Sequence, residues 1–117
     1  MYIKELTEIL WRQCEEAEAR FLQMREEQLE PDFFKQVKPH ADQLRQQLLL
    51  WQQFAIEWCE QVKPKYIYKI QIQQVVEAME QLIVQSYYKE TSKKRFLQAL
   101  HSIQYTLSTL LRAGEGK

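Results

Sequence analysis

The most constraining feature of the sequence is a run of apolar residues between positions 39 and 62 that recur at alternating spacings of four and three. Its members are Leu44, Leu48, Trp51, Ala55, Trp58 and Val62. Apolar residues at this spacing lie on one side of an α-helix and form a seam like that of a coiled coil. The additional apolar residues Leu49, Leu50, Phe54 and Ile56 widen this surface. We therefore expect the helix to contact two or more neighbours.

Three further segments carry the same period. Their apolar positions are Ile3, Leu6, Leu10, Ala17, Phe21 and Met24; then Ile72, Val75 or Val76, Met79, Leu82 or Ile83, and Ser86; then Phe96, Leu100, Ile103, Leu107 and Leu110. The prolines, Pro31, Pro39 and Pro64, all lie outside these runs. Because proline lacks the N–H that a helix interior needs, they mark the breaks. The pattern predicts helices at about 2–29, 39–62, 68–88 and 92–112.

Local signals refine two of these boundaries. Asp32 follows Pro31 and is expected to cap a short apolar turn that contains Phe33, Phe34 and Val37. Thr91 or Ser92 is expected to cap the last helix.

Short connections make consecutive helices antiparallel. A chain of 117 residues has the usual size of one domain. The sequence thus predicts a single all-α domain, residues 1–117, folded as an antiparallel up-down-up-down four-helix bundle. An open three-helix arrangement and a helix-swapped dimer are the alternatives.

Charge is balanced overall but divided along the chain. Residues 1–60 hold seven basic and twelve acidic residues, and the remainder holds nine basic and four acidic residues. Either the two halves neutralise each other or each presents a charged face to a partner. The N-terminus carries acidic residues and does not resemble a signal peptide, and no apolar run approaches the ~20 residues that span a bilayer. Cys14 and Cys59 are interpreted as reduced thiols. We expect a cytoplasmic protein without a membrane segment.

Several strings suggest a family. They are DFFKQVKP at 32–39, PKYIYK at 64–69, QSYYKETSKKRF at 85–96 and SIQYTL at 102–107. In these strings the chain resembles the YppE-like proteins, a small family of unknown function from Bacillus-type bacteria. The resemblance implies a compact cytoplasmic four-helix bundle. It implies no activity, cofactor or partner.

No catalytic or cofactor motif is found. The two histidines, His40 and His101, lack the glutamate three positions earlier that a di-iron bundle requires. Five Glu-x-x-Glu pairs, beginning at Glu5, Glu15, Glu27, Glu57 and Glu77, share helix faces. Such pairs can hold Mg²⁺, so a Mg-dependent nucleotide or phosphate hydrolase is one alternative function. Because no further acids accompany them, solvated helix faces are the preferred interpretation. We expect no catalytic residue, metal or cofactor.

The segment 85–96 is the candidate interaction surface, through Tyr87, Tyr88, Lys89, Lys93, Lys94 and Arg95. Lysines also alternate with tyrosines in residues 63–69, so a nucleic acid or other polyanion is a second alternative. Since the two segments flank one helix, they lie too far apart to form one patch. The bundle instead predicts an intramolecular contact between Lys93, Lys94 and Arg95 and the acidic residues Glu26, Glu27 and Glu30. The favoured function is a non-enzymatic protein-interaction module with an unidentified protein partner, nucleic acid being disfavoured and a homodimer left open.

Overall fold

The computed structural model describes residues 2–115, and the side chains of residues 3–113. Four α-helices lie within this range: α1 (Tyr2–Glu27), α2 (Lys38–Val62), α3 (Lys69–Gln85) and α4 (Lys93–Glu115). A five-residue π-helix, η1 (Phe33–Val37), precedes α2 directly. No strand occurs between residues 2 and 115. The all-α prediction is confirmed.

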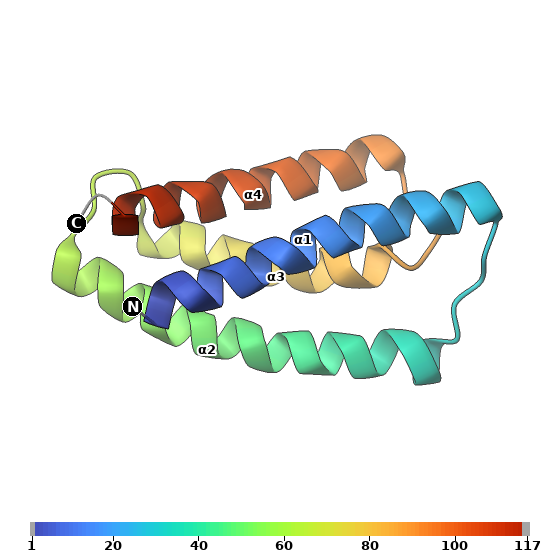
Figure 1. Ribbon diagram of the computed structural model, residues 1–117, viewed down its shortest axis with the longest axis horizontal. Coiled ribbons are helices and arrows are strands. Elements are labelled where there is room, and N and C mark those ends of the chain that lie inside the picture. Colours follow the sequence, from blue (N-terminus) through green and yellow to red (C-terminus); the bar gives the residue numbers. More distant parts are fainter. Residues whose placement is uncertain (1, 116–117) are drawn as a thin grey trace.

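The helices form an antiparallel four-helix bundle (Figure 1). Consecutive helices pack against each other, and α1 also packs on α4, which closes the ring. Two ends result. The η1 end contains η1, the C-termini of α1 and α3 and the N-termini of α2 and α4, whereas the opposite end contains the connection of residues 63–68.

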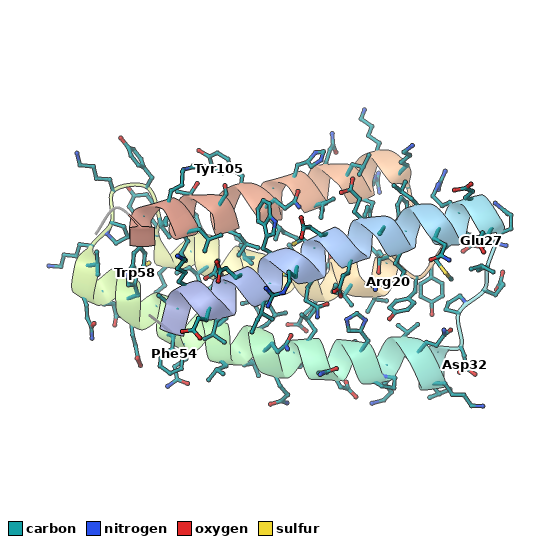
Figure 2. The ribbon with its side chains drawn as sticks, viewed as in Figure 1. Arg20, Glu27, Asp32, Phe54, Trp58 and Tyr105 are labelled. Carbon is teal, nitrogen blue, oxygen red and sulfur yellow. The ribbon has the colours of Figure 1, made fainter. Side chains whose placement is uncertain are left out.

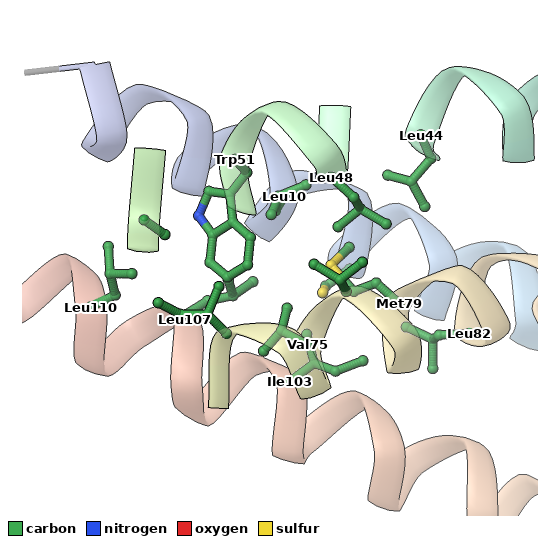
Figure 3. Packing of buried hydrophobic residues seen from close by; sticks show 14 of the residues in the cluster. Leu10, Leu44, Leu48, Trp51, Val75, Met79, Leu82, Ile103, Leu107 and Leu110 are labelled. Carbon is green, nitrogen blue, oxygen red and sulfur yellow. The ribbon is translucent and has the colours of Figure 1, made fainter. Parts of the chain in front are cut away.

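The core is built from the periodic positions of all four helices. Every residue of the α1, α3 and α4 stripes is buried, and so are the α2 residues up to Trp58. Figure 3 shows Trp51 of α2 among Leu10 of α1 and Leu107 and Leu110 of α4. The rings of Phe21 and Phe96 stack with their centroids 4.1 Å apart. The expected widening of the α2 surface is only half correct, because Phe54 and Ile56 pack against the core whereas Leu49 and Leu50 are 44% and 38% exposed.

Thr7 is a polar residue at the centre of this core. Its hydroxyl donates to the carbonyl oxygen of Ile3 at 2.7 Å and accepts from the indole N–H of Trp51 at 2.9 Å. Both polar groups are therefore satisfied without water, as buried polar groups must be. The hydrogen bond between Trp51 and Thr7 thus sets the position of α1 along α2.

Helix ends follow local capping geometry. Gln28 adopts a left-handed conformation, with φ of 55°, and the amide of Leu29 donates to the carbonyl of Met24 at 3.0 Å, which ends α1 at Glu27. After Gln85 the α-helical hydrogen bonding gives way to tighter turns, in which the amides of Tyr87 and Tyr88 donate to carbonyls three residues back. For this reason α3 ends at Gln85, before the expected position 88. Ser92 caps α4 by accepting from the amide of Arg95 at 3.3 Å.

Candidate functional site

A polar network lies inside the η1 end, where α1, α2 and the end of α3 meet. Arg20 donates from Nε to the Ser86 hydroxyl at 2.9 Å, and its guanidinium carbon lies 4.4 Å from the centroid of the Tyr87 ring. The His40 ring lies between Tyr87 and Gln13, with Nδ1 2.7 Å from the Tyr87 hydroxyl and Nε2 3.0 Å from Gln13 Oε1. Figure 2 marks Arg20 on α1. The network joins three helices through side chains alone.

The donors and acceptors of this network define the state of His40. Gln13 Oε1 can only accept, so Nε2 of His40 carries a proton, and in the neutral imidazole Nδ1 then accepts from the Tyr87 hydroxyl. Ser86 is fully buried and donates its own proton to the carbonyl of Ile83 at 2.6 Å, which leaves its oxygen free to accept from Arg20. A neutral His40 therefore satisfies Gln13 and Tyr87, whereas Nη2 of Arg20 is buried without a hydrogen-bond partner among the described residues.

Burial shapes the electrostatics of the network. Desolvation lowers the pKa of Arg20, while Tyr87 and Glu16 oppose that effect. The pKa of His40 is also lowered, chiefly by burial and then by the positive charge of Arg20, with Glu16 acting in the opposite direction. Burial and the positive charge of Arg20 both favour the uncharged imidazole of His40.

The lowered pKa of His40 predicts a pH-dependent stability. Above the unfolded-state pKa of about 6.5, both states hold a neutral imidazole. Below it the unfolded chain binds a proton that the folded chain resists, so the free energy of unfolding falls as the pH drops from about 6.5 through the folded-state pKa. Urea denaturation between about pH 7.5 and about pH 5.5 measures this fall. His40→Gln should flatten it, and the matched substitution of the exposed His101 should leave it unchanged. Equal curves for all three proteins would contradict the prediction.

An outer set of contacts ties the α3–α4 turn to the end of α1. Arg25 donates from one guanidinium nitrogen to the carbonyl oxygens of Lys89 and Thr91, at 3.0 Å and 3.1 Å. The Lys89 ammonium lies 3.3 Å from a carboxylate oxygen of Glu30. The turn and the end of α1 are therefore in contact, but the residues responsible are Arg25 and Lys89. Among the side chains of residues 3–113, no carboxylate lies within 4 Å of Lys93, Lys94 or Arg95.

The structure divides the six residues of the candidate interaction surface into two groups. Tyr87 points inward to His40 and Arg20, and Tyr88 and Lys89 are half-buried. Lys93, Lys94 and Arg95 are exposed on the first turn of α4. These three cations are exposed to a partner, whereas Tyr87, Tyr88 and Lys89 are each half-buried.

The other candidate chemistries gain no support from geometry. Across the described residues, no three His, Cys, Asp or Glu side chains are grouped so that they could hold a metal ion. Burial raises the pKa of the Cys14 thiol to about 12, with Glu15 adding to the effect, and burial also raises the pKa of Cys59. A thiol with a raised pKa is a weak nucleophile. Within residues 2–115, no helix combines the length and hydropathy needed to cross a membrane.

The connection between α1 and α2 presents a second exposed group at the η1 end. Asp32 accepts from the amide of Lys35 at 3.0 Å, and its own amide donates to Gln36 Oε1 at 2.8 Å. The predicted Asp32 cap is thereby confirmed. Val37 of this turn is buried, whereas Phe33 and Phe34 are 46% and 76% exposed and meet edge to face with centroids 5.1 Å apart.

Sequence reasoning missed most of the inner network. Ser86 was recognisable, since it stands on an otherwise apolar stripe and a serine there needs a buried partner. No such signal marks Arg20, Gln13 or His40. Each is a polar residue outside the apolar stripe of its helix, where a polar residue is expected. Only the packing of three helices brings them together.

Fold and site together define a four-helix bundle with a polar network buried at one end and no metal-holding cluster among the described residues. Residues 7–113 match a family described as a bacterial domain of unknown function, DUF1798. The chain belongs to this family.

Two relatives show how far the similarity extends. The uncharacterized protein YppE of Bacillus subtilis is 31% identical over 103 residues, which cover 88% of this chain and 84% of that protein. The crystal structure of that YppE has a TM-score of 0.91 at 28% identity, covering 96% of this chain and 91% of the other. A Listeria innocua protein of unknown function has a TM-score of 0.89 at 27% identity, covering 98% and 94%. The resemblance to the YppE-like proteins is confirmed.

Proposed function

We propose that this chain is a non-enzymatic protein-interaction module of the bacterial cytoplasm, and that it contacts its partner at the η1 end. The observation that carries the proposal is the exposure of Phe33 and Phe34. Adjacent exposed apolar side chains form a patch of the kind that marks protein-interaction sites. Aromatic side chains are also enriched among the residues that dominate binding energy in interfaces.

The turn that carries these rings is held in one conformation. Asp32 closes it with two hydrogen bonds, accepting at its carboxylate from the amide of Lys35 and donating its own amide to Gln36 Oε1, and the buried Val37 anchors it to the bundle. Because the backbone is already fixed, binding through Phe33 and Phe34 loses little conformational entropy. Rigid aromatic anchors of this kind suit recognition more than catalysis.

Exposed cations at the same end complement the aromatic pair. Lys93, Lys94 and Arg95 of α4 have no intramolecular carboxylate partner within 4 Å among residues 3–113. Charged groups at the rim of an interface steer association and select partners of opposite charge. Their position supports a partner with an acidic surface beside an apolar pocket.

The two cysteines support a reducing compartment. Cys14 is buried and Cys59 is half-buried, and both are free thiols. Disulfide-free cysteine usage is typical of cytosolic proteins. The cytoplasm is therefore the proposed site of action.

The proposal is tested by affinity capture with matched variants. The tagged chain, its Phe33→Ser/Phe34→Ser variant and a Leu49→Ser/Leu50→Ser control are incubated with extract of the bacterium that encodes it. The control removes from α2 two apolar side chains that are 44% and 38% exposed. We expect a protein retained by the wild type and the control, and an affinity loss of at least about tenfold in the phenylalanine variant. Thermal unfolding checks that both variants remain folded.

Two results would contradict the proposal. Retention of the same proteins by all three forms would show that the phenyl rings make no contact. Concentration-dependent sedimentation that the phenylalanine substitutions abolish would assign this surface to a homodimer instead.

A further inference from the structure

A second recognition surface lies at the opposite end of the bundle. A hollow of about 580 Å³ opens between the end of α2, the connection of residues 63–68 and the last turns of α4. Trp58 and Ile67 line it with largely buried side chains, and Val62 and Ala113 are half-buried beside them. Figure 2 marks Trp58 near this end of α2. The lining is therefore an apolar surface, large enough for one or two side chains of a ligand.

The rim of this hollow is cationic. Lys63, Lys65 and Arg112 all line it and are exposed. No carboxylate of residues 3–113 lies within 4 Å of Lys63 or Lys65. Tyr66 directly follows Lys65 along the chain, lines the same hollow and has 75% of its surface exposed. An apolar floor surrounded by unpaired positive charge is complementary to an apolar group flanked by negative charge.

An adjoining hollow extends the surface towards α1. It has a volume of about 460 Å³, is lined by Trp11 and Leu111 among others, and shares Arg112 with the first hollow. Trp11 and Leu111 are half-buried. The two hollows share Arg112 of α4 as a lining residue, and we refer to them together as the α2–α4 groove.

We propose that the α2–α4 groove binds an acidic peptide segment, with an aromatic or aliphatic side chain seated over Trp58 and Ile67 and flanking carboxylates paired with Lys63, Lys65 and Arg112. This inference goes beyond the proposed function, since the groove lies at the end of the bundle opposite Phe33 and Phe34. The chain thus offers a separate contact at each end.

Helix dipoles account for only part of the cationic rim. Lys63 follows the C-terminus of α2 and Arg112 lies in the last turn of α4, where positive charge is favourable. Lys65 and Tyr66 belong to the connection, outside both helices, and gain nothing from either dipole. Their exposure beside the apolar floor is accounted for by an external ligand.

Charge distribution favours a peptide over a nucleic acid or a lipid surface. Glu8 lines the adjoining hollow beside Arg12 and Arg112, so a run of phosphates laid along the groove would not meet a continuous positive surface. The chain has a formal net charge of zero and so lacks the broad positive field on which non-specific nucleic-acid binding depends. Separate carboxylates on a peptide can engage the rim cations and avoid Glu8.

The test uses the full-length chain and synthetic peptides. Twelve-residue fluorescent peptides carry a central Trp or Leu flanked by Glu and Asp, and matched peptides carry Gln and Asn in place of the acids. We expect saturable polarisation with the acidic peptides, weakening as salt rises, and at least about tenfold weaker binding to a Lys65→Glu/Arg112→Glu variant. A Lys93→Glu/Lys94→Glu variant makes the same charge change at the η1 end and should bind normally. Amide NMR shifts should concentrate in residues 58–67 and 108–113.

Several outcomes would overturn the inference. They are absence of saturable binding by any acidic peptide, equal binding of the amide-containing peptides, and equal loss in both charge-reversed variants. Tighter binding to single-stranded RNA or to vesicles of anionic phospholipid would assign the groove to those ligands, and self-association mapped to residues 58–67 would assign it to a second copy. The Phe33→Ser/Phe34→Ser variant should bind the peptides normally, so failure here and failure of the proposed function are distinguishable.

Discussion

Replacing Trp51 by alanine is expected to lower the free energy of unfolding by about 3–5 kcal/mol, the usual cost of removing a large aromatic side chain from a packed core. Trp51 is fully buried, and it lies among Leu10, Leu107 and Leu110 from two other helices (Figure 3). Small domains have about 5–15 kcal/mol of stability in total, so this single change removes a large part of it. Urea denaturation followed by circular dichroism measures the loss.

Two further substitutions separate the contributions. Trp51→Phe keeps an aromatic ring but removes the N–H that donates to Thr7, so we expect a loss of only about 1–2 kcal/mol. Tyr105→Ala removes an aromatic side chain that is 67% exposed on α4 and should change stability by less than about 0.5 kcal/mol. A Trp51→Ala loss as small as that of Tyr105→Ala would be inconsistent with the packing described above.

The second large effect is expected for Arg25→Ala, which should lower the free energy of unfolding by about 1–3 kcal/mol. The Arg25 guanidinium satisfies two backbone carbonyls of the α3–α4 turn, those of Lys89 and Thr91. It also lies 5.4 Å from the centroid of the Phe21 ring. Arg25→Lys keeps the charge without the planar geometry, so it should recover only part of the loss. Chemical denaturation gives the stability, and hydrogen exchange of residues 86–92 reports the loosening of the turn.

Lys93→Glu/Lys94→Glu is the matched comparison at the same end of the bundle. These lysines are exposed and lack a carboxylate partner among residues 3–113, so we expect a smaller effect that fades as salt rises. If this double variant were instead more destabilised than Arg25→Ala, the turn would be held to α1 by lysine–glutamate pairing. The comparison thus decides whether Arg25 or lysine–glutamate pairing holds the α3–α4 turn to α1.

Most of the fold could be predicted from the sequence because helix burial repeats locally. On α4, Phe96, Leu100, Ile103, Leu107 and Leu110 follow from spacing alone, and all five are buried. Capping is local too, as Asp32 and Ser92 bond to amides three residues away. The exposure of Leu49 and Leu50 was not predictable, because hydrophobicity does not reveal which side of a long helix lacks a neighbour.

Much less of the candidate site could be predicted. The segment 85–96 was recognised as distinctive, but its residues were assigned to one surface although Tyr87 points inward. That orientation depends on where α3 ends, and α3 ends three residues early because the chain tightens after Gln85. Likewise, the sequence allows any of several cations at the η1 end to pair with the acidic residues at the end of α1. The geometry of the turn selects Arg25 and Lys89.

The sequence by itself determined the four amphipathic helices, their antiparallel order and the residues of the core, because these depend on spacing and on short connections. The tertiary structure decided which polar groups meet. Arg20 and Gln13 of α1, His40 of α2, and Ser86 and Tyr87 directly after α3 form one network only once these helices are packed. The apolar floor and cationic rim of the α2–α4 groove likewise come from segments about 50 residues apart. Hydrogen bonds and ion pairs act over a few ångströms, so their partners are fixed by the packing of the helices and not by position along the chain.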